Sequence, residues 1–281
     1  MYTIGADPEF FISDNYGRVV PVIGLLGGTK EKPVPVLTAE YNGFAVQEDN
    51  VMAEYNIPPA IDPGSFSEFV AMGRRAALNR IRERLPGAEL FPESSATFSS
   101  ELLAHPQAQV FGCSPDFDAY NMGAPLPRIQ PPSLYVEGGA WRFAGGHIHL
   151  GYKAMLTWSV PDFVVASLAD VFLSVVMLAY GADQQGERRK WYGTPGRYRP
   201  TPYGIEYRVL SNRWTMSELW ARLAGRAAFN LMSFLSRGEE EVRRAYNDIP
   251  WNDVRATISS EDTTMAQSLR THARDFGLEV A

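Results

Sequence analysis

Polar residues recur at every second position in four short segments of the chain, namely Asp7-Pro8-Glu9, residues 48–56, His147-Ile148-His149 and Glu206-Tyr207-Arg208. In an extended strand, side chains two residues apart point to the same face of a sheet. Each segment therefore predicts a strand that carries acidic, imidazole or guanidinium groups on one face. If these strands lie side by side, their polar groups share one surface.

Residues 44–57 are predicted to form one strand that contains the second segment. The alternation places Glu48 and Glu54, together with two asparagines, on its polar face. An ordinary half-buried strand with one wet face would show the same alternation. Glutamate and asparagine are poor strand formers, however, so their concentration here favours a functional reason.

The remaining pattern predicts strands early in the chain and helices late. A helix is expected over residues 66–85, preceded by a capping box of Ser65 and Glu68, and strands over residues 141–152 and 204–210. Further helices are expected over residues 160–180, 216–235 and 263–276. This order predicts an α+β fold with an antiparallel sheet whose one face is covered by helices. The apolar helix at 160–180 is expected to be buried rather than membrane-spanning, because Asp162 and Asp170 interrupt it.

The composition is that of an ordinary globular protein, with 45% hydrophobic and 21% charged residues among 281. The formal net charge of −6 argues against a nucleic-acid partner. The single cysteine, Cys113, excludes an intramolecular disulfide framework and a cysteine-cluster zinc site, and we expect it to serve packing. The N-terminus has no basic and apolar leader, so we expect a cytoplasmic location and no membrane partner.

The predicted polar face carries more negative charge than a protein surface can hold without cations. Its carboxylates are Asp7, Glu9, Glu48, Glu54 and Glu206. Oxygen-rich sites of this kind favour Mg²⁺ or Mn²⁺, and the two histidines could bind such a metal or a phosphate oxygen. Taken one at a time, each segment also has an ordinary explanation: a solvated strand end, a wet strand face or a surface ion pair.

An arginine-rich segment, residues 188–199, precedes the last strand and includes Arg188, Arg189, Arg197 and Arg199. Arginine matches phosphate in a two-pronged geometry, so the segment could bind a polyphosphate, although a solvated basic loop is an equal alternative. The chain has no GxxxxGK[ST] loop, and residues 24–30, which contain glycines and a lysine, do not have the spacing of that motif. A nucleotide would therefore be held by metals and arginines.

Together the segments resemble a known group, the carboxylate–amine ligases related to glutamine synthetase and glutamate–cysteine ligase. Within that group they are most similar to the phiEco32-like phage amidoligase type 2 proteins. The matching pieces are Gly5-Ala6-Asp7-Pro8-Glu9-Phe10-Phe11, Gly27-Gly28-Thr29-Lys30, residues 47–59, Gly112-Cys113-Ser114-Pro115-Asp116, residues 145–151 and residues 192–212. Each piece is short, and their order and number give the resemblance its specificity.

The resemblance implies a curved antiparallel sheet, as in the glutamine synthetase catalytic fold, whose concave face holds ATP, metals and two substrates. It implies that the metal ligands are Asp7, Glu9, Glu54, His147 and Glu206. We expect nucleotide contacts from His149, Arg199, Arg189 and Lys30, and catalytic roles for Arg208, Arg197 and Glu48. We expect residues 1–281 to form a single ligase domain with a helical C-terminal part from about residue 213.

The activity that the resemblance implies is an ATP-dependent, Mg²⁺-dependent (or Mn²⁺-dependent) amidoligase. A substrate carboxylate would attack ATP to give an acyl phosphate, and an amine would then displace phosphate. The partners would be a small-molecule or peptide carboxylate and an amine. Asp116 or Glu48 would be the base that takes a proton from the amine. The location would be the cytoplasm of a bacterial host if a phage encodes the chain. Relatives commonly form dimers or rings, so a homo-oligomer is one option. A metal-dependent hydrolase and an inactive binding or virion-associated relative stay open as alternatives.

Overall fold

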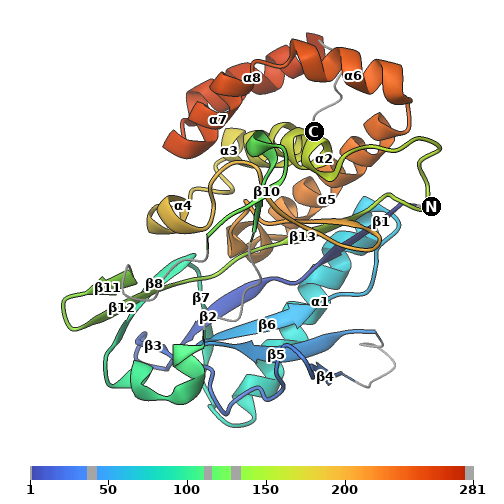
Figure 1. The fold of residues 1–281 in the computed structure, drawn as a ribbon. Coiled ribbons are helices and arrows are strands. Elements are labelled where there is room, and N and C mark those ends of the chain that lie inside the picture. The colour runs from blue at the N-terminus through green and yellow to red at the C-terminus, as the bar shows by residue number, and fades with distance from the viewer. Residues whose placement is uncertain (1, 37–42, 111–115, 128–133, 276–281) are drawn as a thin grey trace.

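The computed structural model describes residues 2–36, 43–110, 116–127 and 134–275, and it has the α+β fold that the sequence predicts. All strand pairings among these residues are antiparallel (Figure 1). The strands are β1 (Thr3–Ala6), β2 (Glu9–Ser13), β3 (Val19–Val20), β4 (Val34–Pro35), β5 (Ala45–Asp49), β6 (Met52–Asn56), β7 (Glu89–Phe91), β8 (Ser95–Ser99), β9 (Phe117–Asp118), β10 (Ala124–Pro125), β11 (Tyr135–Val136), β12 (Gly139–Phe143), β13 (Ile148–Gly151), β14 (Arg197–Pro200) and β15 (Gly204–Tyr207).

The helices follow mainly in the second half of the chain. They are α1 (Pro63–Arg82), α2 (Asp162–Ala169), α3 (Val176–Ala179), α4 (Glu187–Trp191), α5 (Glu218–Leu235), α6 (Glu239–Asp248), α7 (Trp251–Ser260) and α8 (Thr263–Asp275). A π-helical segment, Asp170–Val175, joins α2 to α3. The apolar helix predicted at residues 160–180 therefore changes from the α-helical to the π-helical hydrogen-bonding pattern in its middle. The run Asp162–Ala179 is long and apolar enough to cross a membrane, but 83% of it is buried inside the protein.

Two larger sheets meet along the segment that contains β1 and β2. The first sheet has the order β1-β13-β15-β14-β9-β10, and the second has β3-β2-β6-β5-β4 with β7 beside β2. On one side of this segment, the Glu9 N–H donates to the Gly145 carbonyl at 2.9 Å. On the other side, the Ile57 N–H donates to the Ala6 carbonyl at 3.1 Å. The segment thus joins the two into one curled antiparallel sheet, while β11-β12-β8 form a separate small sheet.

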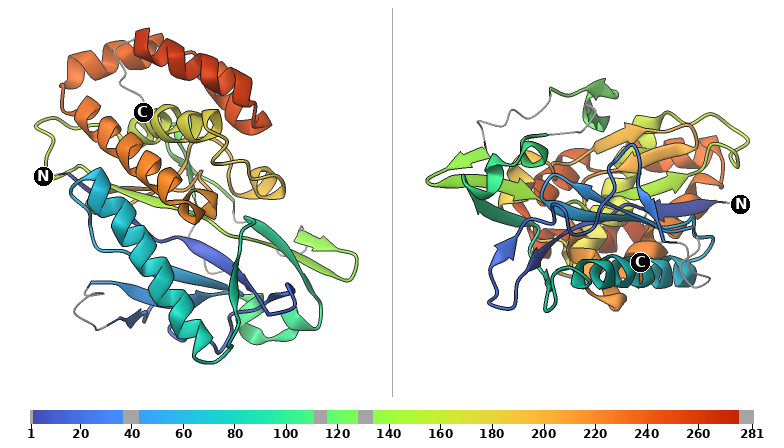
Figure 2. Two further views of the ribbon diagram at one scale, coloured as in Figure 1. Left: turned by 180° about the vertical axis from the view of Figure 1, so that it is seen from behind. Right: turned by 90° about the horizontal axis from the view of Figure 1, so that it is seen from below.

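The two faces of the curled sheet differ in polarity, as the alternation predicts. Ile4, Ile148 and Ile205 are buried in the main core on one face. On that face α1 packs against α5, and the ring of Phe66 on α1 stacks 5.6 Å from the ring of Trp214, which precedes α5. The view from behind in Figure 2 shows α1 and α5 crossing the sheet. The opposite face is left for the acidic and basic groups.

The predicted strand over residues 44–57 is wrong in one respect that affects the site. The chain turns at Asn50, which has a positive φ of 57°, so that β5 and β6 form a hairpin. Paired residues of a hairpin share a face, and the register pairs Gln47 with Glu54 but Glu48 with Ala53. Glu48 and Glu54 therefore lie on opposite faces, because a turn between them breaks the simple alternation.

Two smaller predictions are also corrected. The N-cap of α1 is Asp62, whose side chain accepts from the Ser65 N–H at 2.9 Å, with Pro63 in the first turn. The expected capping box of Ser65 and Glu68 is therefore not what begins this helix. The strand predicted over residues 141–152 is divided into β12 and β13 by a break at residues 144–147.

Candidate active site

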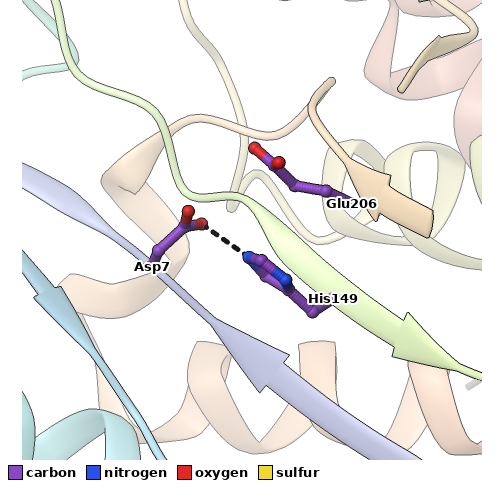
Figure 3. Close-up of side chains that lie close together, drawn as sticks. All are labelled: Asp7, His149 and Glu206. Carbon is purple, nitrogen blue, oxygen red and sulfur yellow. Dashed lines mark ion pairs between the residues drawn. The ribbon is translucent and has the colours of Figure 1, made fainter. Parts of the chain in front are cut away.

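Three neighbouring strands bring Asp7, His149 and Glu206 together on the polar face (Figure 3). The register pairs Gly5 with His149 and His149 with Glu206, and Asp7 follows Gly5 by two residues. All three side chains therefore point the same way. The Asp7 Oδ1 lies 3.2 Å from the His149 Nε2. Each residue has one ligand atom within 4.8 Å of the others, so the group could hold a metal ion.

The second predicted histidine, His147, lies beside this group. Its Nδ1 is 3.5 Å from Asp7 Oδ1 and 3.4 Å from Glu206 Oε1. The two glycines before it allow this placement. A Cβ added to Gly145 would lie 2.3 Å from the His147 ring, and one added to Gly146 would lie 2.2 Å from the Ser211 carbonyl oxygen. Because they have no Cβ, Gly145 leaves room for the His147 imidazole and Gly146 leaves room for the backbone of Ser211.

The charged residues of the first group, Asp7, His149 and Glu206, stabilise one another's ionised forms. Burial raises the pKa of Asp7, but the imidazoles of His149 and His147 outweigh it and leave the pKa well below its usual range. Burial opposes protonation of His149, yet Asp7 and then Glu206 raise its pKa to about 10. Burial also raises the pKa of Glu206, and Arg208, with His147 and Arg199, reverses this. Without metal, the group is a network of ionised pairs.

A second group of three carboxylates, Glu9, Asp49 and Glu54, lies on the next strands. Glu9 is paired in register with Glu54, and the Gly145 N–H donates to Glu9 Oε2 at 2.6 Å. Burial, and then Asp7 and Glu9, raise the pKa of Glu54. Burial and Glu9 raise the pKa of Asp49 to about 6, while Lys30 is the cation that counteracts this most. Among the described residues, no lysine or arginine forms an ion pair with these three carboxylates.

Arginines lie on the far side of Glu206. Arg199 Nη1 is 3.0 Å from Glu206 Oε2, and Arg208 also forms an ion pair with Glu206. Arg208 Nε is 2.8 Å from Asp116 Oδ1, and Arg199 Nη2 is 3.8 Å from the same atom. Arg197 Nε donates to the Thr194 Oγ1 at 2.5 Å, and burial lowers the pKa of Arg197 while Asp116 and Asp118 oppose this. The structure thus brings Arg199 and Arg208 together at Glu206 and Asp116, and it pairs Arg197 of β14 with Asp118 of β9.

Glu48 was expected to be catalytic, and the structure corrects this. Its carboxylate accepts from the backbone N–H groups of Leu26 and Gly27 at 3.0 and 2.7 Å, on the face away from the site. The residue next to it, Asp49, takes the place expected for Glu48 in the carboxylate group. The sequence signal that was missed is the polar pair Asp49-Asn50, since both residue types favour turns.

Arg189 was expected to contact the nucleotide, and the structure contradicts this as well. Its guanidinium is buried and forms ion pairs with Asp183 at 3.0 Å and Glu261 at 3.3 Å. Arg188 is equally buried and donates to the Val209 carbonyl at 3.1 Å. These two arginines tie α4 to the core, so the arginine-rich segment is divided between structure and site.

Two further predictions have different outcomes. Lys30 is exposed, close enough to act on the pKa of Asp49 but outside the ion-pair network. Cys113 lies outside the described residues. Tyr203 was not predicted, and its hydroxyl is 2.5 Å from the His149 Nδ1, which fixes that imidazole between Tyr203 and Asp7.

The chain was compared with known proteins. Residues 137–269 match the sequence model of the phage phiEco32-like COOH.NH2 ligase-type 2 family. None of the curated proteins matches the chain. Among solved structures, a crystal structure of a bifunctional glutathione synthetase from Pasteurella multocida is similar at 10% identity and a TM-score of 0.38, over 99% of this chain and 50% of that chain. The chain therefore spans half the length of that synthetase.

The matched region includes the HxH pair, the arginine-rich segment and the strand of Glu206 and Arg208, but not Asp7, Glu9, Asp49 or Glu54. The match confirms the resemblance that the motifs predicted, and it shows that residues 137–269, just under half of the chain, are similar to the phage phiEco32-like COOH.NH2 ligase-type 2 family.

Proposed function

We propose that the protein is an ATP-dependent, Mg²⁺-dependent ligase that joins a carboxylate to an amine. The observation that carries this proposal is the pair of three-residue groups, Asp7–His149–Glu206 and Glu9–Asp49–Glu54, on one face of the sheet. Arg199 and Arg208 border the first group. Acids for divalent ions beside arginines for phosphate are the parts that phosphoryl transfer requires.

The donor atoms of both groups fit a hard divalent cation. Carboxylate oxygens predominate, and Mg²⁺ and Mn²⁺ prefer oxygen ligands. The second group holds three carboxylates close together, and the pKa values of Asp49 and Glu54 are raised, so a cation would relieve this concentration of negative charge. A bound ion would neutralise charge on the phosphates of ATP and polarise the transferring phosphoryl group.

In the proposed reaction, an oxygen of the substrate carboxylate attacks the γ-phosphorus of ATP, and ADP leaves. The amine then attacks the acyl carbon, and inorganic phosphate leaves with the carboxylate oxygen that attacked. Arg208 and Arg199 stabilise the phosphoryl oxygens as their charge redistributes. No covalent intermediate with the protein is needed.

The amine must lose a proton to become the amide. Of the two acids considered for this role, Glu48 faces away from the site, whereas Asp116 forms ion pairs with Arg208 and Arg199. A carboxylate held in this way can accept a proton when the arginines contact phosphate instead. We therefore assign the base to Asp116.

The test is an incubation with ATP, Mg²⁺ and pools of small acids and amines, followed by mass spectrometry of the products. We expect phosphate to be released only when both an acid and an amine are present, together with a conjugate whose mass is their sum less one water. Release of phosphate with neither substrate would favour a metal-dependent hydrolase. Failure to bind ATP with metal present would favour an inactive relative.

A further inference from the structure

The side chain of Tyr203 reaches the first group of site residues from the turn between β14 and β15. Its hydroxyl is 2.5 Å from the His149 Nδ1, and the two rings lie 6.1 Å apart. The other ring nitrogen of His149, Nε2, faces the Asp7 carboxylate at 3.2 Å. The imidazole is thus held at both nitrogens, by a site carboxylate on one side and by a phenol on the other.

Backbone hydrogen bonds fix the turn that carries Tyr203. The Thr201 N–H donates to the Gly204 carbonyl at 3.0 Å, which closes the turn. The Tyr203 carbonyl accepts from the N–H groups of Tyr152 and Lys153 at 3.0 and 3.1 Å. Both donors directly follow β13, the strand that carries the histidine of the first group. The phenol and the imidazole are therefore held in place by the same part of the sheet.

The position of Tyr203 decides which nitrogen of His149 can bind a metal ion. A neutral imidazole carries one proton and binds a metal through its other nitrogen. Because Nε2 is the nitrogen that faces Asp7, a metal ion held by this group leaves the proton on Nδ1. The Nδ1–H then donates to the Tyr203 hydroxyl oxygen. Such a partner on the second nitrogen is what orients metal-binding histidines.

The hydroxyl of Tyr203 keeps its own proton for a further acceptor. Among the residues that the structure describes, this hydroxyl has one hydrogen-bond partner, the His149 ring. A phenol that accepts one hydrogen bond can still donate another. Tyr203 is 45% exposed, so a ligand can approach its side chain. An unused donor therefore lies beside the group that could hold a metal ion and, with it, the anionic oxygens of a ligand.

We propose that Tyr203 binds through two hydrogen bonds: it accepts from the Nδ1–H of a metal-bound His149, and it donates its hydroxyl proton to a phosphate oxygen of ATP. The first makes Tyr203 a positioning residue for the metal ligand, and the second makes it a direct contact of the nucleotide. This inference rests on the proposed function, since it assumes that a metal ion and ATP meet at the first group. It joins metal affinity and phosphate affinity in one side chain.

The first measurement is Mn²⁺ binding to the full chain, by calorimetry without nucleotide. Tyr203→Phe keeps the ring and removes the hydroxyl, so it should weaken Mn²⁺ binding at one site by about tenfold, as is usual for loss of a partner behind a metal-binding histidine. Tyr135→Phe is the matched control, because Tyr135 is an exposed tyrosine on β11 in the separate small sheet. It should leave the Mn²⁺ affinity unchanged.

The second measurement is binding of a non-hydrolysable ATP analogue and of adenosine, at Mn²⁺ concentrations that saturate each variant. Tyr203→Phe should weaken binding of the ATP analogue by about tenfold, as expected for loss of a hydrogen bond to a charged group. It should leave adenosine binding unchanged, because adenosine has no phosphate. Tyr135→Phe should bind both molecules as the unaltered protein does.

Nuclear magnetic resonance of ¹⁵N-labelled histidine rings gives a readout that a loss of stability alone does not produce. With Mg²⁺ bound, the proton of the His149 ring should lie on Nδ1 in the unaltered protein. The exchange of that proton with water should be faster in Tyr203→Phe, because the variant lacks the acceptor.

A proton on Nε2 with Mg²⁺ bound, or an unchanged Mn²⁺ affinity in Tyr203→Phe, would overturn the positioning role of Tyr203. Unchanged binding of the ATP analogue at saturating Mn²⁺, or an equal loss for adenosine, would overturn the phosphate contact. If the unaltered protein binds Mn²⁺ but no ATP analogue, the proposed function is wrong along with this contact. If the unaltered protein binds the analogue and Tyr203→Phe behaves as it does, only this inference is wrong.

Discussion

The two groups of buried carboxylates differ in what balances their charge. Glu206 forms ion pairs with Arg199 and Arg208, so its negative charge is offset inside the protein. In the part of the chain that the structure describes, Glu9, Asp49 and Glu54 have no lysine or arginine as an ion-pair partner. Like charges held close together in a buried place disfavour ionisation. The same substitution should therefore have opposite effects on stability in the two groups.

We predict that Glu54→Gln raises the free energy of unfolding of the metal-free protein by roughly 1 kcal/mol, because it removes one of three mutually repelling carboxylates. The same substitution should weaken Mn²⁺ binding at least about tenfold, since it removes an anionic ligand. Urea denaturation and calorimetric titration with Mn²⁺ measure the two effects. A loss of stability together with unchanged Mn²⁺ affinity would contradict the assignment of Glu54.

We predict the reverse for stability in Glu206→Gln. This substitution removes one of the two carboxylates that Arg199 and Arg208 share in a buried network, leaving Asp116, which should lower the free energy of unfolding by about 3 kcal/mol. Binding of the ATP analogue with Mg²⁺ should also be lost, while circular dichroism should still report a folded protein at low temperature. Unchanged nucleotide affinity in this variant would remove Glu206 from the site.

The hairpin of β5 and β6 shows where a sequence pattern stops being informative. The shared face of Asp7, His149 and Glu206 was predictable, because no turn interrupts the alternation within their short segments. Glu48 was assigned to the wrong face, because the turn at Asn50 changes which residues share a face. Whether Asp49-Asn50 continues a strand or turns depends on the register with β6, which is set by contacts that are distant in sequence. The same limit applies to Arg189, whose partner Glu261 lies 72 residues away.

The π-helical segment Asp170–Val175 holds a buried acid directly behind the site. The hydroxyls of Tyr207 and Tyr120 donate to Asp170 at 2.5 and 2.8 Å, and Tyr207 lies between Glu206 and Arg208 in sequence. Burial raises the pKa of Asp170 to about 7 despite these two donors. The wide turn of the π-helix thus links the helical layer to β15.

The raised pKa of Asp170 predicts that the stability of the fold depends on pH. The pKa of Asp170 is higher in the folded protein, about 7, than its ordinary value of 3.8, so the folded state holds the proton more tightly. The resulting stabilisation is full below about pH 4 and is lost as the pH rises through 7, with a slope of at most about 1.4 kcal/mol per pH unit. Asp170→Asn should remove this component of the slope in urea denaturation between pH 4 and 8. An unchanged slope would show that Asp170 is ionised throughout.

The whole molecule brings together residues that lie about 200 positions apart, from Asp7 to Arg208, because the segment of β1 and β2 joins two sheets. The sequence could predict the α+β class and most of the polar face. It could not predict how the sheets join, because that depends on backbone pairings such as Glu9 with Gly145. The family match covers the site residues after residue 137, whereas Asp7, Glu9, Asp49 and Glu54 are placed in the site by the structure alone.

For the whole molecule we predict that Mn²⁺ raises the free energy of unfolding, and that this gain grows as the pH rises above 6. A metal must displace protons from Asp49, whose pKa is about 6, and from Glu54, whose pKa is raised, so affinity should grow as those protons dissociate. At a free concentration about 100 times the dissociation constant, the gain is about 2.7 kcal/mol. Thermal denaturation with Mn²⁺ or chelator from pH 5 to 8 measures it. A gain that falls with rising pH would contradict this assignment.

The most direct test of the central claim follows an oxygen atom. Carboxylates labelled with ¹⁸O are supplied together with unlabelled ATP, Mg²⁺ and amines, and the released phosphate and the conjugate are analysed by mass spectrometry. An acyl phosphate intermediate predicts that one ¹⁸O passes from the carboxylate to phosphate for each amide formed. Phosphate released without label, or released without an amide product, would contradict the ligase mechanism.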